Sequence, residues 1–128
     1  GEHTLTYSLL PHKGDWRTGE TVRRAYELNV PMVSSTSDKA VDSKCFISAD
    51  PPNVVIETVK KAEKEDAIII RMYESFGIEA DFVLKTDIGA VQAFECDLME
   101  RDICPVEINS GMMKISLKPF EIRTIKVK

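Results

Sequence analysis

The feature that most constrains the fold is a rhythm of short apolar or alternating runs that begins at Cys45 and continues to the end of the chain. The runs recur about every ten residues, separated by Pro-Pro, charged or glycine-containing breaks. Several runs alternate between apolar and polar residues, as antiparallel strands with one buried face do. The pattern therefore predicts a mainly β fold, an antiparallel β-sandwich. Its expected strands cover residues 45–49, 54–61, 67–74, 78–86, 90–98, 103–108, 112–118 and 121–127.

Three local signals refine this expectation. Pro51 and Pro52 can donate no ladder hydrogen bonds and must lie between strands. Residues 109–111 fit a three-residue hairpin turn in which Gly111 takes the left-handed position. Ile122 and Ile125 have opposite phases, which predicts a bulge or face switch near Thr124.

The first part of the chain begins with a strand-like pattern. Residues 3–10 alternate, with Leu5, Tyr7 and Leu9 on one side and Thr or Ser on the other, which predicts a strand half buried against a core. The chain starts at Gly1, without Met and directly before this run, so we expect it to be a piece of a longer polypeptide.

One short helix, about three turns long, is predicted near the N-terminus. Thr18 or Asp15 can cap it, and Asn29 with Pro31 closes it. Its apolar residues follow the i, i+3, i+4 spacing: Val22, Ala25 and Tyr26. The expected plan is a single domain over residues 1–128, with a strand-plus-helix linking segment over 1–31, an exposed loop over 33–43 and sandwich strands over 44–128.

Composition excludes several classes of partner. The formal charge is −4 and the pI about 5.2, with no basic block that could follow a phosphate backbone, so no nucleic acid is expected. No apolar run reaches the roughly 20 residues that cross a bilayer, and no signal peptide is evident, so no membrane partner is expected. Cys45, Cys96 and Cys104 fit neither a disulfide framework nor a CxxC motif, and predict packed thiols in a cytoplasmic protein.

Catalytic constellations find little support within the chain. His3 and His12 are roughly 30 Å apart if extended, too far for one metal ion, so no metal site and no cofactor are expected here. The acids between residues 95 and 102 could face one another as glycosidase carboxylates do, but a charged strand face is the preferred interpretation. These acids are Glu95, Asp97, Glu100 and Asp102.

Aromatic residues offer one candidate for sugar contact. Tyr7 and Tyr26 occupy core-side positions in the expected elements, whereas Trp16 lies in a loop and could stack on a pyranose ring. Asp15 and Trp16 are therefore the candidate substrate-proximal residues, and no catalytic residue is assigned.

Blocks distributed along the whole chain resemble the C-terminal β region of glycoside hydrolase family 38, the α-mannosidases, in particular the bacterial type. The first block resembles the family pattern G-x-H-x-F-x-Y-S-L-x-P-H, with Leu5 in place of the usual Phe. The loop at 33–43 matches no family pattern. The blocks, in the family's order, are GEHTLTYSLLPH (1–12), GDW (14–16), AYELNVP (25–31), DPPNVVIETVKKAE (50–63), RMYE (71–74), DLME (97–100) and KPFEIRT (118–124).

The resemblance implies that the parent enzyme hydrolyses α-mannosides with retention, using a carboxylate nucleophile and a zinc ion held in an N-terminal α/β domain. No position here matches the zinc ligands or the nucleophile, so this part is expected to be inactive alone and to brace its own catalytic domain. Residues 3–16 are the strongest candidates for that packing or for lining the sugar cleft. The alternatives are a freestanding carbohydrate-binding module that uses Trp16, and a sandwich unrelated to sugars.

Overall fold

The structure, a computed structural model, describes residues 1–40 and 42–128. The chain divides into two units, Gly1–Val41 and Asp42–Lys128. Residues 33–40, 42 and 43 are exposed and without regular structure, as the composition predicted; Val41 of the same expected loop lies outside the described residues.

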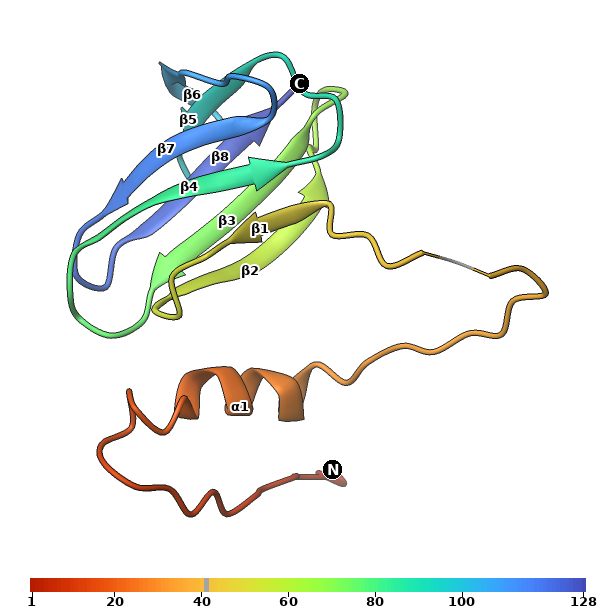
Figure 1. The fold of residues 1–128 in the computed structure, drawn as a ribbon, viewed down its shortest axis with the longest axis vertical. Coiled ribbons are helices and arrows are strands. Elements are labelled where there is room, and N and C mark those ends of the chain that lie inside the picture. The colour runs from red at the N-terminus through yellow and green to blue at the C-terminus, as the bar shows by residue number, and fades with distance from the viewer. Residues whose placement is uncertain (41) are drawn as a thin grey trace. The chain divides into compact units, whose positions relative to one another are not determined.

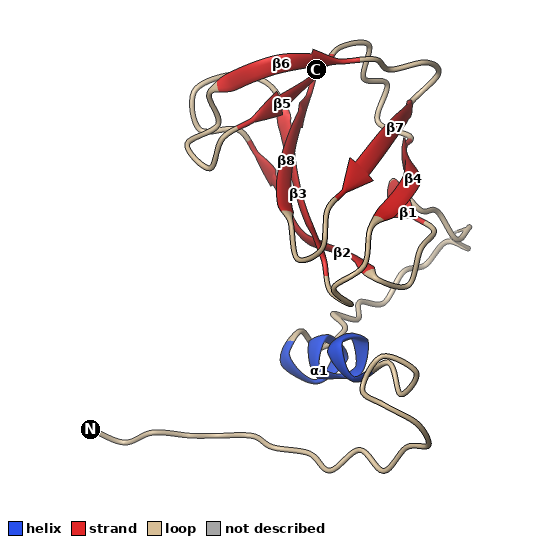
Figure 2. Cartoon of the chain, turned by 90° about the vertical axis from the view of Figure 1, so that its left-hand side faces the viewer, coloured by secondary structure: helices blue, strands red, loops and turns tan. Residues whose placement is uncertain are grey.

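The second unit is a β-sandwich of two antiparallel sheets, seen as two layers in Figures 1 and 2. One sheet has the order β1-β4-β7 and the other β2-β3-β8-β5-β6. The predicted fold class is therefore confirmed, and each expected run overlaps one strand. The strands are β1 (Ile47–Ala49), β2 (Val54–Lys61), β3 (Ile68–Glu74), β4 (Ala80–Thr86), β5 (Ala93–Cys96), β6 (Asp102–Val106), β7 (Met112–Leu117) and β8 (Ile122–Val127).

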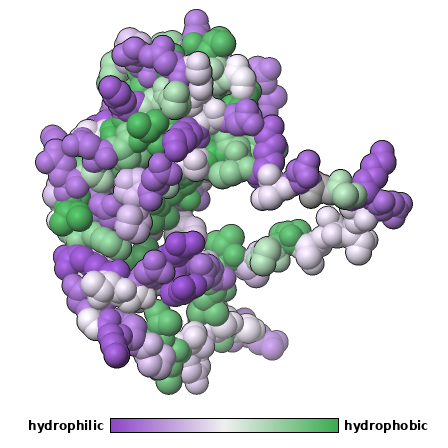
Figure 3. All heavy atoms as spheres, in the orientation of Figure 1, coloured by the Kyte–Doolittle hydropathy of each residue, from purple (hydrophilic) through white to green (hydrophobic). Residues whose placement is uncertain are grey.

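The main core lies between the two sheets. Leu84 of β4 pairs with Met113 of β7, and Ile70 of β3 pairs with Ile125 of β8; all four side chains are fully buried. On the face seen in Figure 3, hydrophobic and hydrophilic residues are interspersed over the three-stranded sheet. Along β4 and β7, buried residues alternate with more exposed ones. Each of these strands therefore buries one face, as its alternating sequence pattern predicted.

The five-stranded sheet departs from simple alternation because β3 and β8 are buried on both faces. Ile69 on the outer face of β3 is as inaccessible as Ile70 on the inner face. The predicted bulge near Thr124 is wrong: β3 and β8 pair in continuous register from Ile68 to Tyr73. Thr124 and Lys126 follow the same phase as Ile122 on the outer face, and neighbouring side chains cover them there. Register shifts lie instead in β2, between Ile56 and Thr58, and in β5 where it pairs with β6, between Glu95 and Cys96.

Two further details of the sandwich differ from the sequence interpretation. Asn109 and Met112 exchange backbone hydrogen bonds around a two-residue turn, not a three-residue one. Both Ser110 (φ 48°) and Gly111 (φ 76°) are left-handed, which a tight hairpin turn of this kind requires. Ile78, expected on the buried side of β4, precedes the strand and is 52% exposed.

The first unit contains helix α1 (Thr21–Asn29), which confirms the predicted helix. Its N-cap is Glu20 rather than Asp15 or Thr18, because a separate turn over residues 15–19 comes before it. Val22 and Tyr26 are half-buried, and the helix contains no fully buried residue. Among the described residues, no helix is long and apolar enough to cross a membrane.

The predicted strand over residues 3–10 is wrong for this structure. The segment is extended but forms no ladder with any described residue, because a strand requires a neighbouring strand to accept and donate its hydrogen bonds. Its apolar side chains therefore face solvent: Leu5, Tyr7 and Leu9 are 88–89% exposed, so Tyr7 is not in the core.

Candidate functional site

Asp15 and Trp16, the candidate substrate-proximal residues, lie in the turn before α1. The Asp15 carboxylate accepts hydrogen bonds from the backbone N–H groups of Arg17 (3.1 Å) and Thr18 (3.0 Å). The Thr18 N–H holds the pKa of Asp15 below its usual range, even though the side chain is exposed. Trp16 is 37% exposed, and the Arg17 guanidinium lies 4.6 Å from its ring centroid.

This geometry leaves the indole only partly open. A guanidinium stacked on the ring makes a cation–π contact and covers area that a sugar would otherwise use. The structure thus places Asp15 and Trp16 at the surface, and their approach to substrate stays a prediction.

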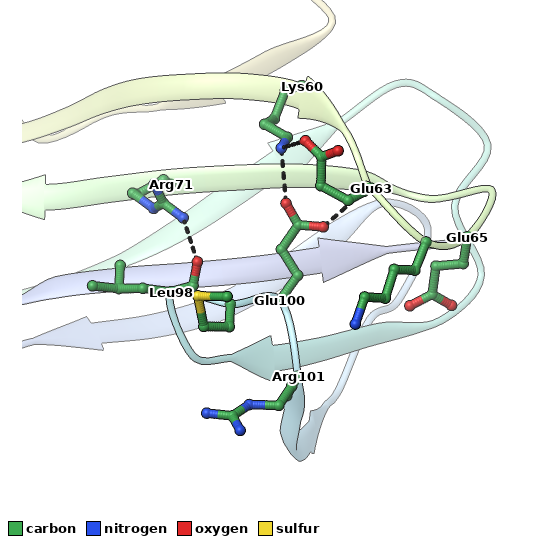
Figure 4. A pocket seen from close by; sticks show the side chains of 9 residues that line it. Lys60, Glu63, Glu65, Arg71, Leu98, Glu100 and Arg101 are labelled. Carbon is green, nitrogen blue, oxygen red and sulfur yellow. Dashed lines mark hydrogen bonds and ion pairs between the residues drawn. The ribbon is translucent and has the colours of Figure 1, made fainter.

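The second unit has a hollow of about 500 Å³ on the outer face of its five-stranded sheet. Strands β2 and β3 and the loops over residues 62–67 and 97–101 form it (Figure 4). Its lining is mostly charged, with an apolar pair on one loop. The lining residues are Lys60, Glu63, Lys64, Glu65, Arg71, Leu98, Met99, Glu100 and Arg101.

Glu100 joins the two loops across this hollow. Its carboxylate accepts hydrogen bonds from the Glu63 backbone N–H (2.8 Å) and from Lys60 Nζ (2.9 Å), as Figure 4 shows. The Glu63 N–H is the main reason that the pKa of Glu100 lies below its usual range. The backbone of Glu100 is left-handed (φ 64°), a conformation unfavourable for a residue with a Cβ atom unless neighbours enforce it.

The loop over residues 97–101 is further held by Asp97. Its carboxylate accepts from the backbone N–H groups of Met99 (2.9 Å) and Arg101 (3.0 Å) and pairs with Arg101 Nε (2.7 Å). Arg71 Nη2 also donates to the Leu98 carbonyl (3.5 Å). These contacts fix the loop while leaving the side chains of Leu98 and Met99 65% and 72% exposed.

Lys126 lies beneath this loop with only 3% of its side chain exposed. Its ammonium group contacts the Glu65 carboxylate, the Asp102 carboxylate (2.6 Å) and the Glu100 carbonyl (3.3 Å). Burial alone would lower the pKa of Lys126, but the hydrogen bonds to Asp102 and Glu65 outweigh it and raise the pKa. The lysine is therefore a buried cation that holds the outer face of β8 together.

The acids considered as a glycosidase set are all ion-paired. Glu95 lies 3.7 Å from Arg123 Nε, and Asp97, Glu100 and Asp102 have the cationic partners described above. The last three have lowered pKa values, so they are ionised at neutral pH. A glycosidase also needs a protonated carboxylic acid to donate to the leaving group. Glu95 and Asp102 lie on strands and Asp97 and Glu100 lie in the loop between them, so the set forms structural ion pairs rather than one charged strand face.

The three cysteines fit the packed-thiol prediction only in part. Cys96 is buried, and burial together with a hydrogen bond to Asp102 raises the pKa of its thiol to about 11. Cys45 and Cys104 are free but exposed, which corrects the expectation. Cys104 lies on β6, an edge strand of the sheet, where one side is uncovered.

Glu74 is a structural residue that the sequence reasoning missed. It is 1% exposed, and its carboxylate accepts from Asn53 Nδ2 and from the backbone N–H groups of Phe76, Gly77 and Phe120, at 2.7–3.0 Å. Burial tends to raise its pKa, but these donors outweigh burial and lower it. The available signal was a carboxylate at the end of a strand, three residues before a glycine turn.

The fold and this surface define a class: a β-sandwich domain whose loops are pinned by ionised carboxylates and present a small apolar pair to solvent. Residues 53–125 match the sequence model of the glycosyl hydrolases family 38 C-terminal beta sandwich domain. This match covers more than half of the chain. The chain therefore belongs to glycosyl hydrolase family 38, within the C-terminal β-sandwich part of its members.

Similar curated proteins are α-mannosidases. The chain is 31% identical to alpha-mannosidase 2C1 of Mus musculus and of Homo sapiens, over 98% of its own length and 13% of theirs. It is 29% identical to alpha-mannosidase G of Dictyostelium discoideum, over 98% of its length and 12% of that protein. The chain thus spans about an eighth of the length of these relatives. The bacterial subtype stays a prediction.

Proposed function

We propose that this chain is the non-catalytic C-terminal domain of a zinc-dependent retaining α-mannosidase, and that it braces the catalytic domain of the same polypeptide. The observation that carries the proposal is the match along 98% of the chain to proteins named as α-mannosidases, in which the matched part is 13% of the length. The substrate would be an α-mannoside, and its catalytic residues would lie outside residues 1–128.

The geometry of the hollow supports bracing rather than chemistry. The Glu65 and Glu100 carboxylates in its lining are already bound by lysines and, for Glu100, by a backbone N–H group, so they do not fit a zinc ion, which needs free ligands. A rigid loop that exposes two apolar side chains suits contact with another protein surface, since little ordering entropy is lost on docking. Zinc would be held by the remainder of the enzyme.

A cytoplasmic location belongs to the same proposal. Free thiols persist in reducing compartments, and Cys45, Cys96 and Cys104 are all free. Asp15 and Trp16, in an exposed turn, are the residues that we place nearest the sugar cleft.

The proposal is tested by measuring the release of nitrophenol from a nitrophenyl α-mannoside. We expect the full-length polypeptide to release product in a zinc-dependent manner, and purified residues 1–128 to release none with zinc present. A full-length polypeptide without such activity, or turnover by residues 1–128 that survives rigorous purification, contradicts the proposal.

A further inference from the structure

Residues 3–10 combine a strand's sequence pattern with a complete lack of burial. Leu5, Tyr7 and Leu9 repeat at every second position, so in an extended chain they project from one side. All three are 88–89% exposed. Exposing three large apolar side chains on one stripe is unfavourable by about 2 kcal/mol each relative to full burial.

The unit that contains this segment has no core of its own. None of the described residues 1–40 is buried, and α1 contributes none either. A stretch of this size cannot be stable without burying apolar surface, because nothing then offsets the conformational entropy of ordering it. Burial of Leu5, Tyr7 and Leu9 therefore requires a protein surface that residues 1–40 do not provide.

The first unit is shared with relatives that are much longer than this chain. The family's C-terminal sandwich model begins at residue 53 and leaves the first unit out. The α-mannosidase relatives nevertheless match 98% of the chain, so the first unit is part of what they share. Most of each relative's length lies outside the match, which is ample chain for another sheet.

We infer that residues 3–10 form a β-strand of a sheet whose other strands lie elsewhere in the same α-mannosidase polypeptide, with Leu5, Tyr7 and Leu9 in that sheet's core. Backbone pairing supplies the N–H and C=O partners that the segment lacks here. The first unit then belongs structurally to a neighbouring domain rather than to the single domain expected from the sequence. The inference rests on the proposed function only for the identity of the polypeptide.

Amide hydrogen exchange on the full-length polypeptide tests the inference directly. In a strand, at least every second amide of residues 4–10 donates to a neighbour, so we expect exchange at least about 100-fold slower than in an unstructured chain. Exchange of all these amides at the unstructured rate overturns the inference. Protection that disappears on dilution, in step with dissociation of a dimer, also overturns it, because the partner is then a second copy.

A matched pair of variants tests which side faces the core. Tyr7→Asp should lower the thermal midpoint of the full-length protein by more than about 3 °C, whereas Thr6→Asp on the other side should lower it by much less. Tyr7→Phe should restore the midpoint to near the wild-type value. Equal effects of Tyr7→Asp and Thr6→Asp contradict the assignment of the core side. If Tyr7→Asp does not fold, exchange in the wild-type protein decides.

The outcomes separate this inference from the proposed function. If the amides are protected but the polypeptide has no mannosidase activity, the strand inference is supported and the proposed function is contradicted. If the polypeptide has zinc-dependent activity but the amides exchange freely, only the strand inference is contradicted.

Discussion

Glu74 is the single residue that organises one end of the sandwich. Its two carboxylate oxygens accept four hydrogen bonds, three of them from backbone N–H groups of the segments that follow β3 and β7. Phe120, one of those donors, is left-handed (φ 59°), and the pull of the carboxylate on its N–H helps hold it there. Glu74 thus connects the turn that follows β3 with Phe120, which lies 46 residues after Glu74 in the sequence.

Glu74→Gln should destabilise the domain by about 2 kcal/mol. The NH2 group of glutamine replaces one carboxylate oxygen and cannot accept hydrogen bonds from the buried N–H groups that face it. Urea unfolding at pH 7 measures the difference, with the exposed Glu79→Gln as the control that should change little. The folded pKa of Glu74 lies below its ordinary 4.5. The wild-type advantage should therefore be complete above pH 4.5 and disappear as the pH falls through the lowered folded value. A difference that grows on acidification contradicts this account.

Trp16 is the residue on which the cleft proposal depends. If its turn borders the sugar cleft, Trp16→Ala in the full-length enzyme should raise KM several-fold and change kcat little, since lost stacking weakens ground-state and transition-state binding alike. Phe46→Ala, an exposed aromatic with a lysine over its ring, is the matched control. An unchanged KM in Trp16→Ala contradicts the proposal that Asp15 and Trp16 lie near the sugar cleft.

At the scale of elements, local pattern predicted the strands well where one face is buried. The bounds of β2, Val54–Lys61, agree with the expected run because Pro51-Pro52 stops pairing immediately before it. Lys126 shows where this reasoning fails. A lysine in a strand indicates solvent, yet residues 65, 100 and 102, distant in sequence, bury and pair it. The hollow was missed for the same reason, since the loop over 97–101 folds back across the sheet.

Two glycines with similar backbone conformation form a matched pair: Gly111 in the turn between β6 and β7, and Gly89 in the loop between β4 and β5. Gly111 and Gly89 both have φ near +75°, but an added Cβ at Gly111 meets the backbone carbonyl of Thr86, while at Gly89 it meets nothing within 4 Å. Gly89→Ala should cost about 1 kcal/mol from backbone strain alone, and Gly111→Ala at least twice that. Thermal unfolding compares the two. Equal losses mean that the Thr86 contact does not constrain the turn.

Glu100 pins the loop that presents Leu98 and Met99. Glu100→Ala removes the acceptor of the Glu63 N–H, so exchange of the Glu63 amide should accelerate by at least about tenfold. Glu79→Ala should leave that rate unchanged. An unaltered Glu63 rate in Glu100→Ala shows that other contacts hold the loop.

At the scale of the whole molecule, the chain is a stable sandwich joined to a unit without a core. The sandwich is accounted for by its own residues, which form two sheets with the main core between them. The first unit and the exposed pair Leu98 and Met99 gain a physical reason only when further protein is present. In the proposed function, that protein is the remainder of an α-mannosidase polypeptide, which this part braces.

Calorimetric unfolding of the full-length polypeptide, with residual activity measured on the same heated samples, tests bracing most directly. If the sandwich braces the catalytic domain, residues 42–128 and the remainder should unfold in one cooperative transition, and mannosidase activity should be lost across it. A separate, earlier transition of the sandwich that leaves the activity intact would contradict the account.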